Sequence, residues 1–285
     1  MSYSTYHKAL RLAQRDRKTT ASGTLAVLEE RRLDIAYREP VGLMDIPMDL
    51  IAGTLTEARA ISFSPGFYPL MEENSEFAMK WTALSEVHLK EGIRDPIKAV
   101  EYLGRYYVVE GNKRVSVLKF YGAVSIPGMV TRYVPKRTPE TEAYYEYLDF
   151  YRATGINYLL FDRVGGYTDL LKAMSREPGK PWNADDLRSF RNLYCMFREA
   201  YLRQGGTLSE AAEAFLVYLD VFDYQESLHK LPHELDSDLA RLRPELLNRQ
   251  EVVRLVDNMK KQSPELVDEL IPPLISYGNF QKILT

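Results

Sequence analysis

Residues 105–122 read RYYVVEGNKRVSVLKFYG, a pattern that predicts a strand joined to a helix by a short polar turn. Gly111 lets the backbone bend at this turn without a Cβ clash. Residues 124–130 then predict the next strand. The first turn of such a helix presents free N–H groups and the positive end of the helix dipole, and Lys113 and Arg114 add two cations. The turn is therefore predicted to hold an anion.

Two segments upstream of this turn extend the pattern into a resemblance to a known family. Residues 44–51, MDIPMDLI, and residues 91–97, EGIRDPI, precede the turn EGNKR of residues 110–114. Taken together over residues 41–134, they resemble the ParB/sulfiredoxin-like fold, in which an extended strand, a Gly-x-x-Arg turn and a helix bind nucleotide phosphates. The resemblance implies an α+β domain with a small mixed sheet and helices. It also implies a bacterial protein whose cofactor is a nucleoside triphosphate, ATP or CTP, with Mg.

Position 112 separates the branches of this family. Sulfiredoxin-like enzymes carry their reactive cysteine there, whereas this chain has Asn112, and its single cysteine, Cys195, lies far downstream. Chromosome-partitioning ParB proteins carry Gly-Glu-Arg-Arg, so the missing glutamate puts CTP hydrolysis in doubt. Because Glu110 precedes the glycine, the turn is most similar to the free-serine-kinase-like branch. That similarity implies that Glu110 acts as a general base or a magnesium ligand.

A second polar segment, residues 52–59 with the sequence AGTLTEAR, follows the predicted first strand. Family members often place a charged residue there, facing the phosphate turn. The resemblance therefore implies two catalytic residues, Glu110 and Glu57. It also implies six nucleotide- or phosphate-binding residues: Gly111, Asn112, Lys113, Arg114, Arg59 and Thr56. Phosphoryl transfer depends mainly on charge neutralisation and alignment, so this set would suffice for it. The alternative for Glu57 and Arg59 is a surface ion pair.

The predicted ParB-like function has two main forms. As an enzyme, the protein would be a phosphotransferase or a nucleotide hydrolase that uses ATP or CTP. As a non-catalytic module, it would sense a nucleotide or a phosphorylated small molecule through residues 111–114. A DNA-partitioning module is a third form, but DNA is the less favoured partner. Residues 184–285 contain twelve basic and seventeen acidic residues, a net charge of −5, and DNA affinity depends on cations.

Composition indicates an ordinary folded protein. Of the 285 residues, 45% are hydrophobic and 12% are aromatic, which is enough to build a core. No apolar run approaches the roughly 18 residues needed to cross a bilayer, and the first ten residues lack an apolar signal core. We therefore expect a cytoplasmic protein with no membrane partner. One cysteine and four scattered histidines predict no metal site.

Turn-forming residues divide the chain into three predicted parts. Residues 1–40 form a helical lead-in with a net charge of +3, in which residues 23–34 are predicted to be helical. Residues 41–176 form the ParB/sulfiredoxin-like nucleotide-binding domain. A linker, REPGKPWN, leads into an all-α helical bundle at residues 183–285. The bundle offers a surface for a homodimer or for a partner protein.

Overall fold

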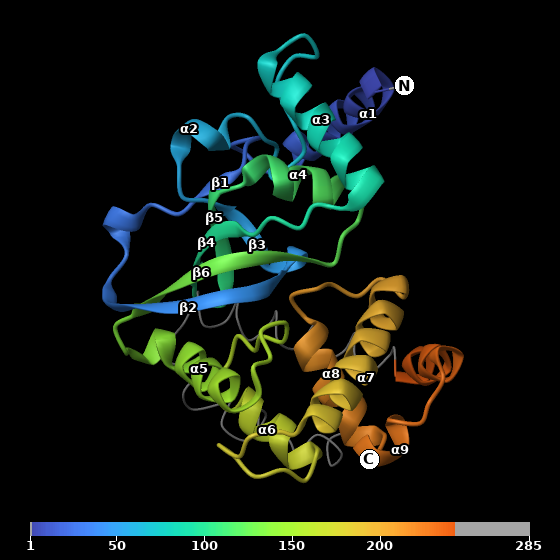
Figure 1. Cartoon of the computed structure of the whole chain (residues 1–285). Helices are drawn as coiled ribbons and strands as arrows, with labels where there is room; N and C mark the ends of the chain where they lie inside the picture. The colour runs from blue at the N-terminus through green and yellow to red at the C-terminus, as the bar shows by residue number, and fades with distance from the viewer. Residues whose placement is uncertain (1, 243–285) are drawn as a thin grey trace. The chain divides into compact units, whose positions relative to one another are not determined.

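The computed structural model describes residues 2–242, and the chain divides into two compact units. Unit 1 comprises Met1–Lys172 and Glu177–Trp182, and unit 2 comprises Ala173–Arg176 and Asn183–Thr285. Unit 1 combines a mixed sheet with helices, whereas the described part of unit 2 is helical (Figure 1). The predicted combination of a mixed sheet with helices is confirmed. The three predicted domain ranges stay predictions.

Six strands form the sheet of unit 1, in the order β1-β3-β5-β4-β6-β2. They are β1 (Ala26–Val27), β2 (Ile35–Pro47), β3 (Ile51–Thr54), β4 (Ile97–Tyr102), β5 (Arg105–Glu110) and β6 (Ser125–Pro135). β4 pairs antiparallel with β5, and β2 pairs antiparallel with β6, whereas the other neighbours are parallel. The helix predicted at residues 23–34 is wrong. That segment forms the edge strand β1 and a short 3-10 turn at Glu30–Arg32, because β1 completes the sheet beside β3.

The helices of unit 1 begin and end at residues suited to those positions. They are α1 (Ser2–Asp16), α2 (Glu57–Ala60), α3 (Glu76–Glu91), α4 (Asn112–Phe120), α5 (Glu142–Thr154) and α6 (Gly166–Ala173). Ser75 caps α3 by accepting a hydrogen bond of 3.1 Å from the Ala78 N–H. α3 ends at Gly92 and α5 ends at Gly155, both with positive φ, as helix C-termini favour.

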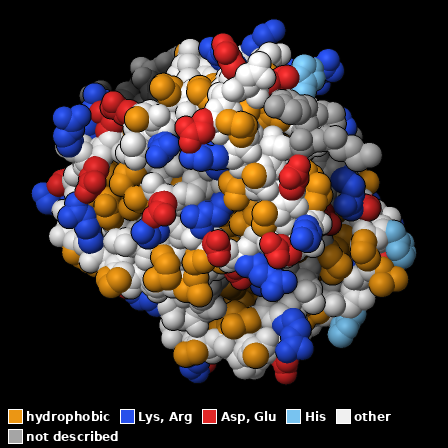
Figure 2. Space-filling model, turned by 45° about the horizontal axis from the view of Figure 1, so that its top comes forward, with side chains coloured by type: hydrophobic (Ala, Val, Ile, Leu, Met, Phe, Trp, Pro, Cys, Tyr) orange, Lys and Arg blue, Asp and Glu red, His pale blue; other side chains and the backbone are white. Residues whose placement is uncertain are grey.

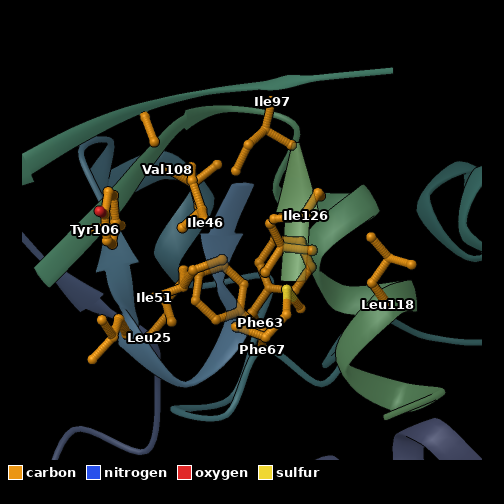
Figure 3. Packing of buried hydrophobic residues seen from close by; sticks show 14 of the residues in the cluster. Leu25, Ile46, Ile51, Phe63, Phe67, Ile97, Tyr106, Val108, Leu118 and Ile126 are labelled. Atoms are coloured by element: carbon orange, nitrogen blue, oxygen red, sulfur yellow. The ribbon is translucent and has the colours of Figure 1, made fainter. Parts of the chain in front are cut away.

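The main core of unit 1 lies between the strands and α4 (Figure 3). Ile97, Val108 and Ile126 from three strands are fully buried there, together with Phe67 from the loop before α3. Leu118 joins them from α4. Burying one such side chain contributes about 1.5–3 kcal/mol. This packing fixes α4 against the sheet and so fixes the turn that precedes it.

A second cluster holds α1, α3 and α4 together. Trp81 of α3 is fully buried, and its ring contacts Tyr6 and Phe120 edge-on, with centroids 5.5 Å apart in both cases. Its indole N–H donates a 2.8 Å hydrogen bond to the Ser116 hydroxyl in α4. The Tyr6 hydroxyl donates to the Met71 carbonyl at 2.8 Å. These contacts leave the opposite side of α1 facing solvent.

Unit 2 is built around aromatic side chains. Its labelled helices are α7 (Ala184–Arg203), α8 (Ala211–Val221) and α9 (Tyr224–Ser227), and residues 232–242 are also helical. Asn183 caps α7, because its side-chain oxygen accepts from two backbone N–H groups of the first turn, at 3.0 and 2.9 Å. Phe215 of α8 packs against Tyr194 and Phe197 of α7, with ring centroids 5.3 and 4.9 Å apart. α7 and α8 thus share an aromatic core.

The surface mixes apolar and charged side chains. On the face seen in Figure 2, apolar side chains are interspersed with Lys, Arg, Asp and Glu. Single exposed apolar residues of this kind are normal for a folded protein. Within residues 2–242, no helix has the length and apolar character required to cross a membrane.

Candidate functional site

The polar turn between β5 and α4 adopts the geometry that its glycine predicts. Gly111 has φ 105° and ψ 19°, in the left-handed region. A Cβ at this position would lie 2.5 Å from Cγ2 of Ile97, which is fully buried in β4. Only glycine satisfies both the positive φ and this close approach. The turn is therefore tightly packed against the core.

Glu110, the predicted catalytic residue, lies beside a lysine of the neighbouring strand. Its carboxylate is 2.7 Å from Nζ of Lys98, and both side chains are well exposed. The hydrogen bond from Lys98 lowers the pKa of Glu110, with a smaller contribution from the charge of Arg114. A general base needs a pKa near the working pH. The ion pair with Lys98 instead lowers the pKa of Glu110, away from neutral pH.

Arg114 is engaged with backbone groups before β4. Its Nη1 donates to the carbonyls of Asp95 and Pro96, at 3.0 and 2.6 Å. These bonds tie the first turn of α4 to the segment that enters β4. Arg114 was predicted to bind phosphate, and in the structure its guanidinium stabilises the local backbone.

Asn112 and Lys113 are the first two residues of α4. Nζ of Lys113 lies 4.7 Å from the centroid of the Phe77 ring. Burial lowers the pKa of Lys113, and the positive charges of Lys80 and Arg59 lower it further. Asn112 is 7% exposed, and within the described residues its Oδ1 is buried without a hydrogen-bond partner.

The charge of Arg59, in α2, contributes to lowering the pKa of Lys113 in the first turn of α4. Thr56 precedes α2 without forming a side-chain cap, and Glu57 is exposed in its first turn. Within the part of the chain that the structure describes, no group of three or more His, Cys, Asp or Glu side chains could hold a metal ion. The catalytic and phosphate-binding roles predicted for these residues stay predictions.

A buried charge network in unit 1 escaped the sequence analysis. Glu101 of β4 and Arg132 of β6 are 0% and 1% exposed, and they form a direct ion pair. The Glu101 carboxylate also accepts from the Gly104 N–H at 2.6 Å and from the Tyr144 hydroxyl of α5 at 2.8 Å. Burial alone lowers the pKa of Arg132, but the Glu101 carboxylate raises it above its usual range. Strand alternation with Ile97 places Glu101 on the inward face and was the available signal.

Unit 2 holds a second network that the sequence analysis missed. Lys230 donates to Asp238 at 2.6 Å and to the Tyr218 hydroxyl of α8 at 3.2 Å. That hydroxyl lies 3.1 Å from the Ser227 hydroxyl of α9, and the ammonium lies 4.0 Å from the centroid of the Phe222 ring. We call these five residues the lysine network. It joins α8, α9 and the segment around Asp238.

Residues 211–285 match the model of the FHIPEP family, over about a quarter of the chain. The match begins at the first residue of α8 and includes the whole lysine network. No curated protein sequence matches the chain. The matched residues beyond 242 lie outside the described part.

The ParB/sulfiredoxin-like family predicted from residues 41–134 is wrong by this comparison, because the family whose model matches is FHIPEP. The predicted ParB-like nucleotide-binding function is therefore also wrong. This applies to its catalytic form and to its nucleotide-sensing and DNA-partitioning alternatives. The physical reason lies in the turn. A glycine turn with charged residues is a common way to join a strand to a helix. Here Lys98, the Phe77 ring and two backbone carbonyls are the contacts of those charges.

Proposed function

We propose that this chain is a component of a flagellar or type III secretion export apparatus and that it acts by binding another protein of that apparatus through unit 2. The observation that carries this proposal is the FHIPEP match over residues 211–285, since that family belongs to the export apparatus. The matched residues all fall within unit 2. We place this role on the cytoplasmic side, as the composition predicts.

The described part of the match offers a surface for such a partner. Val221 and Leu231 are 54% and 56% exposed. They adjoin Phe222 and Lys230, which contact each other across the lysine network. Because Phe222 contacts Lys230, the backbone at Val221 lies near the backbone at Leu231. We call Val221 and Leu231 the aliphatic pair of unit 2. Protein interfaces commonly combine such apolar contacts with a polar rim.

A gene deletion in the organism that encodes the chain tests this proposal. We expect the deletion to reduce the amount of exported protein in the culture medium and to leave that protein inside the cell. Complementation with the native chain restores export. A chain with Val221→Asp and Leu231→Asp does not restore it. Normal export in the deletion strain would overturn the proposal.

Unit 1 offers a matched control. Leu43 and Val124 are 66% and 76% exposed, so they are at least as accessible as the aliphatic pair of unit 2. A chain with Leu43→Asp and Val124→Asp should restore export fully. Its cellular level, measured by immunoblot, should equal that of the native chain. Equal loss of export in both double variants would indicate a general effect of surface change and would contradict a role specific to unit 2.

A further inference from the structure

The outer side of α1 is strongly cationic. Lys8, Arg11 and Arg15 recur at intervals of three and four residues, so they lie along one side of the helix, and all three are exposed. The opposite side carries Tyr6 and Ala9, which are buried against α3. The inward side of α1 therefore secures the helix to unit 1, while the outward side presents positive charge.

The charge of this side is not neutralised within the described part of the chain. Residues 1–19 contain five Lys or Arg and one acidic residue, Asp16. The Asp16 carboxylate accepts from the Ser64 hydroxyl and from the Gly66 N–H, so it points to the loop before α3. Within residues 2–242, none of the five cations has a carboxylate at ion-pair distance. We call Lys8, Arg11 and Arg15 the basic face of α1, and Arg17 and Lys18 follow it in a short 3-10 turn.

Unit 2 carries the opposite charge. Residues 204–240 contain eight Asp or Glu and one basic residue, Lys230, a net charge of −7. Lys230 belongs to the lysine network, where Asp238 is its ion-pair partner. Four acidic residues of this stretch are exposed, and we call them the acidic surface of unit 2: Asp220, Asp223, Glu226 and Glu234.

We propose that the basic face of α1 on one copy of the chain binds the acidic surface of unit 2 on a second copy. The two surfaces are opposite in sign, which attracts and orients two proteins as they meet. The net charge of the whole chain is only −3, so repulsion between copies is weak. Because each copy contributes a different surface, the association is head to tail. This inference does not depend on the proposed export function.

Sedimentation of the native full-length chain at several salt concentrations gives the first test. We expect self-association whose Kd rises about tenfold or more between about 50 mM and about 300 mM NaCl, because salt screens exposed charges. A chain that stays monomeric at low salt overturns the proposal. Vesicles containing phosphatidylserine and duplex DNA form separate arms. Binding to either by a monomeric chain would assign the basic face to phosphate groups and not to a second copy.

A pair of charge-reversed variants gives the sharper test. The first carries Lys8→Glu, Arg11→Glu and Arg15→Glu, and the second carries Asp220→Lys, Glu226→Lys and Glu234→Lys. Each variant alone lacks one of the two surfaces, so each should remain monomeric under conditions where the native chain associates. Mixed together, the first still offers its acidic surface and the second still offers its basic face. The reversed surfaces are also opposite in sign to each other, so we expect the mixture to form a complex that contains the two variants in equal numbers.

The remaining outcomes are equally decisive. A third variant, with Lys90→Glu, Arg94→Glu and Lys172→Glu, changes the net charge by the same amount at exposed cations outside α1, and it should associate like the native chain. Self-association of the first variant at native strength, or failure of the mixture to form a complex, overturns the proposal. If the second variant does not fold by circular dichroism, the first variant mixed with the native chain replaces it. There the first variant should cap native assemblies and reduce their size.

Discussion

The turn before α4 in unit 1 and the lysine network in unit 2 both contain a lysine–carboxylate pair, but the first pair is exposed and the second is largely buried. The turn contains a sequence that resembles a ligand-binding motif. Its Glu110 pairs with Lys98, and both of these side chains are exposed. Its Arg114 donates to two backbone carbonyls. The network has no recognisable motif, yet its Tyr218 and Ser227 are completely buried. The contacts that a charged side chain makes within the fold, which a local motif does not show, therefore decide whether it is available to a ligand.

The largest effect is expected from Lys230→Met. It leaves Asp238, which is 8% exposed, without its ion-pair partner and should destabilise unit 2 by about 3 kcal/mol. Chemical denaturation, together with hydrogen exchange of α8 and α9, measures the loss. The double variant Lys230→Met with Asp238→Leu removes both charges and should recover most of it. Equal instability of the single and double variants would contradict the role given to the pair.

The same network predicts a response to pH. Burial alone lowers the pKa of Lys230, but hydrogen bonds to Asp238 and Tyr218 raise it above its usual value. A raised pKa means that the stabilisation is complete below the usual lysine pKa of about 10.4 and is lost as pH rises through the folded-state value. Denaturation midpoints should therefore fall at alkaline pH in the native chain and fall less in the double variant. Identical alkaline profiles would exclude this contribution.

On the side of the turn, Gly111→Ala should have the largest effect. The positive φ and the approach to Ile97 both oppose a side chain, so we expect a loss of about 2 kcal/mol in the free energy of unfolding. Gly122→Ala is the matched control. Gly122 also has positive φ, but its Cβ would meet no atom within 4 Å, so its variant should lose less. Equal losses would show that packing against Ile97 contributes nothing.

Arg114→Ala should have a smaller effect. It removes two hydrogen bonds to carbonyls at the surface, which we expect to cost about 1 kcal/mol. Arg94→Ala is the control, because Arg94 is an exposed arginine in the same segment of unit 1. Thermal unfolding of the two variants measures the difference. No difference between them would mean that the contacts of Arg114 do not stabilise the turn.

The smallest effect is expected from Glu110→Gln and Glu57→Gln. Both side chains are exposed, and the ion pair of Glu110 with Lys98 is a surface pair of the kind that contributes little. We expect unchanged melting temperatures and unchanged export in complemented cells. A nucleotide panel assayed with the native chain and with Glu110→Gln measures any turnover. Phosphate release by the native chain that disappears in Glu110→Gln would show that the turn before α4 is catalytic and would contradict the structural role given to it here.

Local sequence patterns predicted the local structure well. The strand at residues 105–110, the turn at Gly111 and the helix after it follow from turn chemistry and apolar spacing. The interaction partner of each charged side chain could not be predicted from these local patterns. The partner of Glu110 is twelve residues away on another strand, and the partner of Glu101 lies on a third. Such pairings depend on the order of strands in the sheet, which one sequence does not reveal.

Export in complemented cells distinguishes unit 1 from unit 2 as the part of the chain that carries the function. Cells that carry either Arg114→Ala or the double variant Val221→Asp with Leu231→Asp in place of the native gene are compared for protein exported into the medium. The claim that unit 2 carries the function predicts normal export with Arg114→Ala and reduced export with the double variant, at equal cellular levels of the chain. Reduced export with Arg114→Ala and normal export with the double variant would contradict it.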